Sequence, residues 1–213
     1  MKLSVVQRKL QNVSPYFLGE KHIPSLIRKL NSELNSSKIY FTSKRYEGGW
    51  FKNHSVIISA EYCPHIMGIP EHVIVSLAFP KDEKKITLSK SGAKNLELKL
   101  MKTLFHELRH KQQCKIKRKY TDGNYYPIPR NVISSDIPKL RYFGTPDEID
   151  AHAFETIVDV SYKKLDINRL KYANKITWRE SEAVFLYRKF FRKNDSKVWK
   201  KFLKKVYKNN IGG

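Results

Sequence analysis

The chain has few of the features that would support a disulfide-braced or membrane-spanning protein. Its 213 residues include only two cysteines, Cys63 and Cys114, whose wide separation excludes a CxxC zinc or redox unit and allows at most one disulfide. We predict two reduced, buried thiols. No stretch approaches the roughly 18 uncharged apolar residues of a membrane span. The apolar patch from Leu3 to Val6 is too short for a secretory signal. We therefore expect a cytoplasmic protein without a transmembrane segment.

Acidic residues are also scarce, with 20 Asp+Glu against 42 Lys+Arg and a formal net charge of +22. Such an excess favours nucleic acid or an anionic surface as a partner, because each neutralised phosphate releases counterions. Lysine outnumbers arginine 31 to 11, and asparagine and isoleucine are frequent. An A+T-rich genome would produce the same composition without any selection for binding. Both explanations stay open at the level of sequence.

What the chain does contain is enough apolar material, 40% of its residues, for one packed domain over residues 1–213. A helix is predicted from Ile23 to Leu34, with Pro24 tolerated in its first turn. Runs of β-branched and aromatic residues then predict three or four strands of a mostly antiparallel sheet. These runs are Lys38–Ser43, Ser55–Ala60, Val73–Phe79 and Lys85–Ser89.

A long helix is predicted next, from about Ala93 to Lys117, because leucine recurs every four residues at Leu96, Leu100, Leu104 and Leu108. Residues 118–144 show no clear period and predict a long loop. Thr145 then has the features of a helix cap, followed by proline and two acids, and that helix should run to about Lys164. Two further helices are expected near 177–193 and 196–209. The fold class is therefore α+β, with a small sheet packed on the long central helix and a basic helical segment from about residue 165.

The long helix carries the pentamer His106-Glu107-Leu108-Arg109-His110. Four residues of α-helix turn through about 400°, so His106 and His110 project from one face and suit two imidazole ligands of a single zinc ion. Glu107 is placed to take a proton from a zinc-bound water, as a general base in hydrolysis. The spacing predicts a zinc site on this helix.

A catalytic zinc usually has three protein ligands and one open position, so a further ligand must come from elsewhere in the chain. The best candidate segment is the helix that begins at Pro146. Glu148, His152 and Glu155 share one of its faces, whereas Asp150 points elsewhere.

The pentamer, followed by a helix that reads Glu-x-Asp-Ala-x-x-Phe, resembles zinc metallopeptidases of the gluzincin type and is locally similar to the ImmA/IrrE peptidase domain. The resemblance covers about 60 residues, from Leu96 to Glu155. It implies that His106, His110 and Glu148 bind zinc, that Glu107 is the base, and that His152 supports a ligand histidine.

The sequence departs from that family in two places. The family position that matches His152 is usually asparagine, and the usual Leu-Leu-Met-Pro ending of the helix is absent. His152 could therefore be a fourth ligand or replace Glu148, with Asp150 as a further alternative. The lysine- and asparagine-rich composition also resembles that of small phage-encoded proteins, for which the host cytoplasm or the virion would be the expected location.

Several other residues are candidates for parts of a site. Tyr125, Tyr126 and Tyr142 lie between the two candidate ligand segments, and Tyr142 is our candidate donor to an oxyanion, although ordinary packing explains each tyrosine as well. Cys114 extends the histidine stripe but rises too far along the helix to be a good third ligand. The remaining histidines, His22, His54, His65 and His72, form no ligand spacing and are interpreted as structural.

The C-terminal helix is amphipathic and strongly basic. From residue 161 onward the chain has 16 basic and 4 acidic residues, so the positive excess is concentrated there. Its apolar stripe comprises Val198, Trp199, Phe202, Leu203, Val206 and Tyr207. Its lysines are Lys197, Lys200, Lys201, Lys204, Lys205 and Lys208. The segment could hold nucleic acid or an anionic membrane, or it could close the core with a solvated outer face.

These features lead to one main hypothesis and two alternatives. The main hypothesis is a zinc-dependent metallopeptidase that acts on a protein or peptide substrate. Its basic surface suggests DNA or RNA as a further partner, so the substrate could itself be bound to nucleic acid. The first alternative is a non-catalytic nucleic-acid-binding or virion-associated protein with a structural or vestigial zinc site. The second keeps the zinc but hydrolyses another bond. The sequence specifies neither the substrate nor the oligomeric state.

Overall fold

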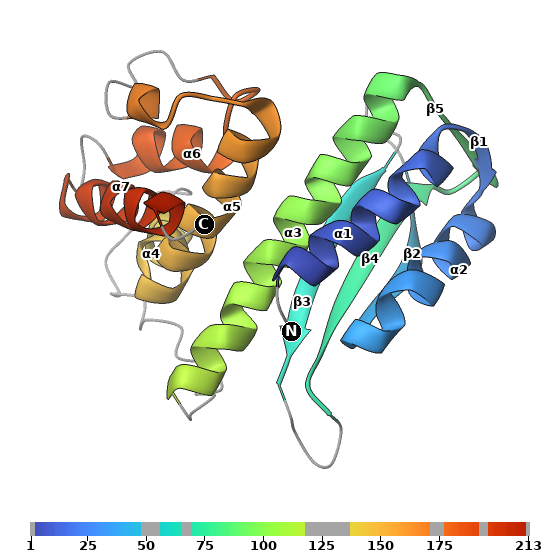
Figure 1. Cartoon of the computed structure of the whole chain (residues 1–213), viewed down its shortest axis with the longest axis horizontal. Helices are drawn as coiled ribbons and strands as arrows, with labels where there is room; N and C mark the ends of the chain where they lie inside the picture. The colour runs from blue at the N-terminus through green and yellow to red at the C-terminus, as the bar shows by residue number, and fades with distance from the viewer. Residues whose placement is uncertain are drawn as a thin grey trace. The chain divides into compact units, whose positions relative to one another are not determined.

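A computed structural model describes residues 3–47, 56–64, 70–117, 137–170, 177–191 and 196–211 (Figure 1). The fold class is α+β, as the sequence predicts. The chain divides into two compact units, residues 1–111 and 112–213. The prediction of a single domain over 1–213 stays a prediction.

Two helices open the first unit, α1 (Leu3–Val13) and α2 (Ile23–Leu34), and each is followed by a short 3-10 turn (Ser14–Phe17 and Asn35–Ser37). The predicted helix at 23–34 is confirmed. Pro24 lies in its first turn, where its missing N–H has no helical partner to lose. Every third or fourth residue of α2 is buried, so the helix covers the core with one apolar stripe (Ile23, Leu26, Leu30, Leu34).

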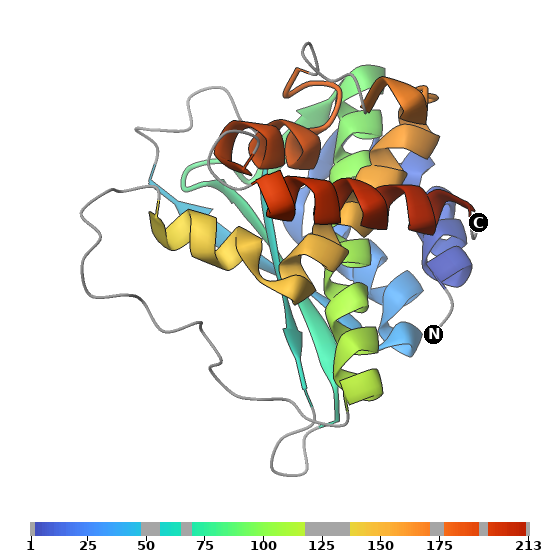
Figure 2. The same cartoon turned by 90° about the vertical axis from the view of Figure 1, so that its left-hand side faces the viewer.

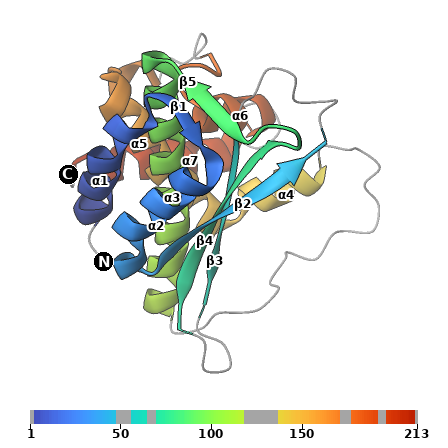
Figure 3. The ribbon, with the colours of Figure 1, turned by 90° about the vertical axis from the view of Figure 1, so that its right-hand side faces the viewer.

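A three-stranded sheet follows, made of β2 (Ile39–Tyr46), β3 (Ile57–Cys63) and β4 (His72–Pro80). The strand order is β2-β4-β3, with β2 parallel and β3 antiparallel to the central β4. Alternate residues of β4 are buried at 0–1% exposure (Val73, Val75, Leu77, Phe79). Helices α1, α2 and α3 lie along one face of this sheet (Figures 1 and 3).

A second sheet has two antiparallel strands, β1 (Gly19–His22) and β5 (Lys85–Leu88). The strand predicted at 85–89 is therefore present, but it pairs with β1 rather than with the larger sheet. The sequence did not predict β1, because its four residues lack the β-branched side chains that mark a strand. Two of the three strand pairings in the described residues are antiparallel.

The long helix α3 spans Lys90–Lys117 and confirms the predicted central helix. Ser89 caps it, since its side-chain oxygen accepts a hydrogen bond of 3.1 Å from the amide of Gly92. The four leucines at intervals of four residues are all buried, with exposures between 0 and 5% (Leu96, Leu100, Leu104, Leu108). This apolar stripe fixes the rotation of α3 about its own axis, and with it the direction in which the histidine pair projects.

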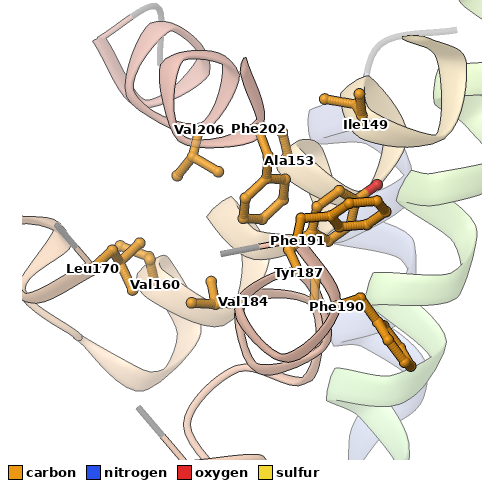
Figure 4. Close-up of a cluster of buried hydrophobic side chains, with 11 residues drawn as sticks. Ile149, Ala153, Val160, Leu170, Val184, Tyr187, Phe190, Phe191, Phe202 and Val206 are labelled. Carbon is orange, nitrogen blue, oxygen red and sulfur yellow. The ribbon is translucent and has the colours of Figure 1, made fainter. Parts of the chain in front are cut away.

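The second unit is helical, with α4 (Ile137–Gly144), α5 (Pro146–Lys163), α6 (Glu182–Phe191) and α7 (Ser196–Ile211), and a 3-10 turn at Ile167–Leu170. Helix α7 packs against α5 and α6 within this unit (Figure 2). Their shared core is rich in aromatic rings (Figure 4). Tyr187 stacks on Phe202 with ring centroids 4.1 Å apart and donates its hydroxyl to the Phe143 carbonyl oxygen at 2.7 Å.

Three predictions about the chain need correction. Residues 137–144, interpreted as the end of a loop, form α4, because a proline in the second helical position is compatible with a helix start. The helix expected near 177–193 begins later, at Glu182, because Thr177 and Glu180 form a hydrogen-bonded turn before it. Both cysteines are free thiols, as predicted, but each is half-buried rather than buried.

Some predictions fall outside the described residues. They concern the rest of the predicted loop at 118–136, with Tyr125 and Tyr126, and the histidines His54 and His65. Within the described part of the chain, no helix combines the length and the apolar character needed to cross a bilayer.

Candidate metal centre

The histidine pair of α3 converges on one point. The Nε2 atoms of His106 and His110 lie 3.1 Å apart, and their rings are nearly perpendicular at 77°. Two imidazole nitrogens bound tetrahedrally to one zinc ion at about 2.05 Å would be separated by about 3.3 Å. The side chains therefore already have the spacing that a shared ion requires, because α3 places them one turn apart.

Glu107 points in a different direction from its two neighbours. Its Oε2 atom accepts a hydrogen bond of 2.8 Å from the backbone amide of Tyr62 in β3. Because β3 is an edge strand among the described strands of its sheet, that amide lies on the side away from β4. One oxygen of the Glu107 carboxylate is thus fixed by the sheet.

Tyr62 also connects the end of the pentamer to the segment before β4. Its hydroxyl donates to Glu71 at 3.2 Å, and the other Glu71 oxygen lies 3.2 Å from the ammonium group of Lys111. Lys111 follows His110 directly in the helix and is only 8% exposed. No sequence pattern indicates Tyr62 or Glu71, because only the strand register brings them to α3.

In the second unit, the first turn of α5 is organised by its cap. Thr145 accepts a hydrogen bond of 3.3 Å from the amide of Glu148 through its side-chain oxygen, and Pro146 occupies the first helical position. The predicted helix start is confirmed. Asp147 and Glu148 lie in the first turn of the helix, near the positive end of its dipole. The Glu148 residue is 7% exposed, so this carboxylate is held inside the protein.

The same helix face carries Glu148, His152 and Glu155, as predicted. The Nδ1–H group of His152 donates to Glu155 Oε2 at 2.9 Å, and its Nε2 lies 3.7 Å from Glu148 Oε2. A carboxylate on Nδ1 leaves the Nε2 lone pair of a neutral imidazole for another partner. The arrangement suits His152 either as a ligand or as a support of Glu148.

Asp150 points away from that face, as predicted. It is 6% exposed and lies 2.9 Å from the ammonium group of Lys205 in α7. Gln113, near the end of α3, donates to Asp150 at 3.3 Å and to the carbonyl oxygen of Asp147 at 3.0 Å. These contacts give Asp150 a structural role within the second unit.

One group of side chains in the described residues could hold a metal ion, namely His106, Glu148 and His152. Their donor atoms, two imidazoles and a carboxylate, suit zinc and other divalent first-row metals, so the group alone does not identify the ion. His110 is not part of this group, although its Nε2 is the atom that lies beside His106.

Tyr142 and Cys63 add no further ligand to these side chains. Tyr142 is 47% exposed and its ring contacts that of Phe143, so its predicted role as an oxyanion donor stays a prediction. Burial raises the pKa of the Cys63 thiol above its ordinary value, and the nearby charges of Glu61 and Glu107 raise it further. Cys63 is therefore held as a neutral thiol at pH 7, which makes it a poor metal ligand or nucleophile.

Comparison of the chain with protein-family models, with curated proteins and with solved structures found no match. The resemblance to the ImmA/IrrE peptidases therefore stays a prediction, carried by the pentamer and by Glu148.

Proposed function

We propose that this chain is a zinc-dependent hydrolase, and specifically a metallopeptidase. The observation that carries the proposal is the 3.1 Å separation of His106 Nε2 and His110 Nε2, with Glu107 adjacent to them in the same helix. Two neutral nitrogen donors beside a carboxylate are what a metal-assisted hydrolysis needs from one element.

The proposed ligands are His106, His110 and Glu148. The first two supply the converging pair on α3, and the third supplies a buried carboxylate held by the cap of α5. Bound zinc would act as a Lewis acid that polarises the scissile carbonyl group and lowers the pKa of a water molecule. Three protein ligands would leave one coordination position open for these tasks.

Glu107 is the proposed general base. The amide of Tyr62 binds its Oε2, which orients the carboxylate. The carboxylate would accept the proton of the attacking water. The same carboxylate would then pass that proton to the leaving amine. Among the described strands β3 lies at an edge of its sheet, next to this residue, and an extended peptide could add to that edge. This position supports a peptide rather than a small ester as the substrate.

His152 favours a second candidate function, a structural zinc site. Its Nδ1–H group is held by Glu155 and it belongs to the group that could hold a metal. If His152 bound together with the other three ligands, four protein donors would close the coordination sphere and leave no position for a substrate. The protein would then use zinc to stabilise its fold.

Glu107→Gln tests the catalytic proposal. Hydrolysis of fluorescently labelled casein by the zinc-loaded protein should fall by about 10²- to 10⁴-fold, the usual contribution of a general base, while zinc stays bound. Glu83→Gln is the matched control, because Glu83 is an exposed glutamate that lies outside β3 and the histidine pair. Equal rates for wild type and Glu107→Gln would contradict the mechanism. Stoichiometric zinc in a protein that cleaves nothing would favour the structural site.

A further inference from the structure

The apolar face of α7 is buried in the core of its own unit. Phe202 and Val206 have no exposed surface, and Val198, Trp199 and Leu203 pack against the same cluster. The interpretation of this segment as a helix that closes the core is thus confirmed. A helix that lies in a membrane interface must bury its apolar face in the lipid. Because this face is already buried in protein, α7 has only its charged side to offer a partner.

That side is a stripe of five exposed lysines, which we call the α7 lysine stripe (Lys197, Lys200, Lys201, Lys204, Lys208). At 100° per residue, all five fall within an arc of about 100° on the helix. They extend over about 16 Å at 1.5 Å per residue. Helix α7 contains no acidic residue, so the stripe has one sign of charge along its whole length.

The position of the stripe is fixed from both flanks of the helix. Lys205, on one flank, lies 2.9 Å from Asp150 of α5. Tyr207, on the other, donates its hydroxyl to the carbonyl oxygen of Ile167 at 3.1 Å. Lysines mounted on a docked helix keep their spacing when a partner approaches, so less ordering is required on binding.

We propose that the α7 lysine stripe binds the phosphate backbone of duplex nucleic acid, without reading its sequence. Over about 16 Å of axis, one strand of B-form DNA presents about five phosphates at 3.4 Å each. This charge density matches five lysines on one helix face. Lysine ammonium groups act as point charges on phosphate, and the stripe carries no asparagine, glutamine or arginine that would read bases in register.

The test compares the quadruple variant Lys200→Gln, Lys201→Gln, Lys204→Gln, Lys208→Gln with the wild-type full chain. The control removes the same charge from four exposed lysines of the first unit (Lys44, Lys84, Lys90, Lys99). Binding to a fluorescent 20-base-pair DNA duplex is measured by anisotropy across a series of salt concentrations.

For the wild type, the logarithm of the association constant should fall linearly with the logarithm of salt concentration. The slope should become shallower by about 0.9 for each phosphate contact that the α7 variant loses, or about 2 to 4 in total. Affinity at about 0.1 M salt should drop at least tenfold, whereas the control should keep most of the wild-type slope. Circular dichroism shows whether the variant keeps its helices, and Lys→Arg at the same four positions should restore binding.

Three outcomes would overturn the proposal. The first is an equal loss in the control, which would show that net charge alone drives binding. The second is the absence of DNA binding by the wild-type protein at about 0.05 M salt. The third is binding to phosphatidylserine vesicles, lost in the α7 variant, without binding to DNA. Because Glu107→Gln and zinc removal leave the stripe intact, this test is independent of the proposed peptidase activity.

Discussion

The two helices that carry the candidate ligands hold them in different ways. In α3, His106 and His110 lie in the interior of a 28-residue helix and face each other at 3.1 Å. In α5, Glu148 lies in the first turn, where a cap positions its backbone, and its side chain is 3.7 Å from His152. The α3 pair depends on helical geometry alone, whereas the α5 pair depends on a cap and a carboxylate neighbour.

This difference explains why the sequence predicts the geometry of the α3 histidines better than it predicts which α5 side chain is a ligand. Helical spacing fixes the relative positions of His106 and His110 on α3, so the motif alone predicts their geometry. On α5, three side chains that can bind metals share one face, and the choice among them depends on how the rest of the protein uses each one. Asp150, on another face, contacts Lys205 and Gln113, and Glu155 accepts a hydrogen bond from His152. Glu148 and His152 are the α5 members of the group that could hold a metal ion.

The largest expected effect comes from removing the core beneath α5. Phe202→Ala deletes a side chain with no exposed surface and should lower the free energy of unfolding by about 3–5 kcal/mol. Hydrogen exchange should rise over α5 and α7 more than over α3. Leu100→Ala is the matched change in the first unit and should cost about 2–5 kcal/mol. Equal loss of protection in α3 and α5 after Phe202→Ala would contradict the expectation that separate cores stabilise these two helices.

The next effect concerns His152. Replacing it by asparagine should weaken zinc binding by about 10- to 100-fold, the usual result of losing a residue that orients a ligand. One zinc ion per chain should still bind at saturation, as measured by titration against a competing chelator. Complete loss of binding would instead identify His152 as a ligand and support the structural site.

A smaller effect is expected at the cap of α5. Thr145→Ala removes the side-chain oxygen that accepts from the Glu148 amide and should destabilise the protein by about 1 kcal/mol in urea unfolding. Thr145→Ser keeps that oxygen and should have almost no effect. If the alanine and serine variants unfold alike, the cap does not hold the first turn of α5.

The smallest effect is a change in the reactivity of Cys63. Burial and the charges of Glu61 and Glu107 raise the pKa of this thiol, so its thiolate fraction at pH 8 is lower than that of a free cysteine. In a Cys114→Ser background, iodoacetamide should react more slowly than with a free thiol, and the rate should reach its midpoint at a higher pH. Glu107→Gln removes one of the charges and should increase the rate by a few-fold at most. Unchanged kinetics would show that Glu107 does not act on Cys63.

The sequence predicts those parts of the molecule that local patterns determine. The leucines of α3, the proline of α2 and the Thr145 cap each fix an element through contacts within a few residues, and those elements are confirmed. Strand pairing was harder to predict, because it joins residues far apart in the chain. Neither β1 nor the parallel pairing of β2 with β4 has a local pattern. The contact between Glu107 and the Tyr62 amide was missed for the same reason.

The proposed zinc ligands are His106, His110 and Glu148, and metal analysis of the purified protein tests them most directly. The wild type should carry one zinc ion per chain. His106→Ala, His110→Ala and Glu148→Ala should each reduce zinc affinity by more than about 100-fold, beyond what loss of an orienting residue causes. Asp150→Asn is the control and should retain zinc. Full zinc occupancy in Glu148→Ala, or a wild-type protein that binds no zinc, would contradict the account.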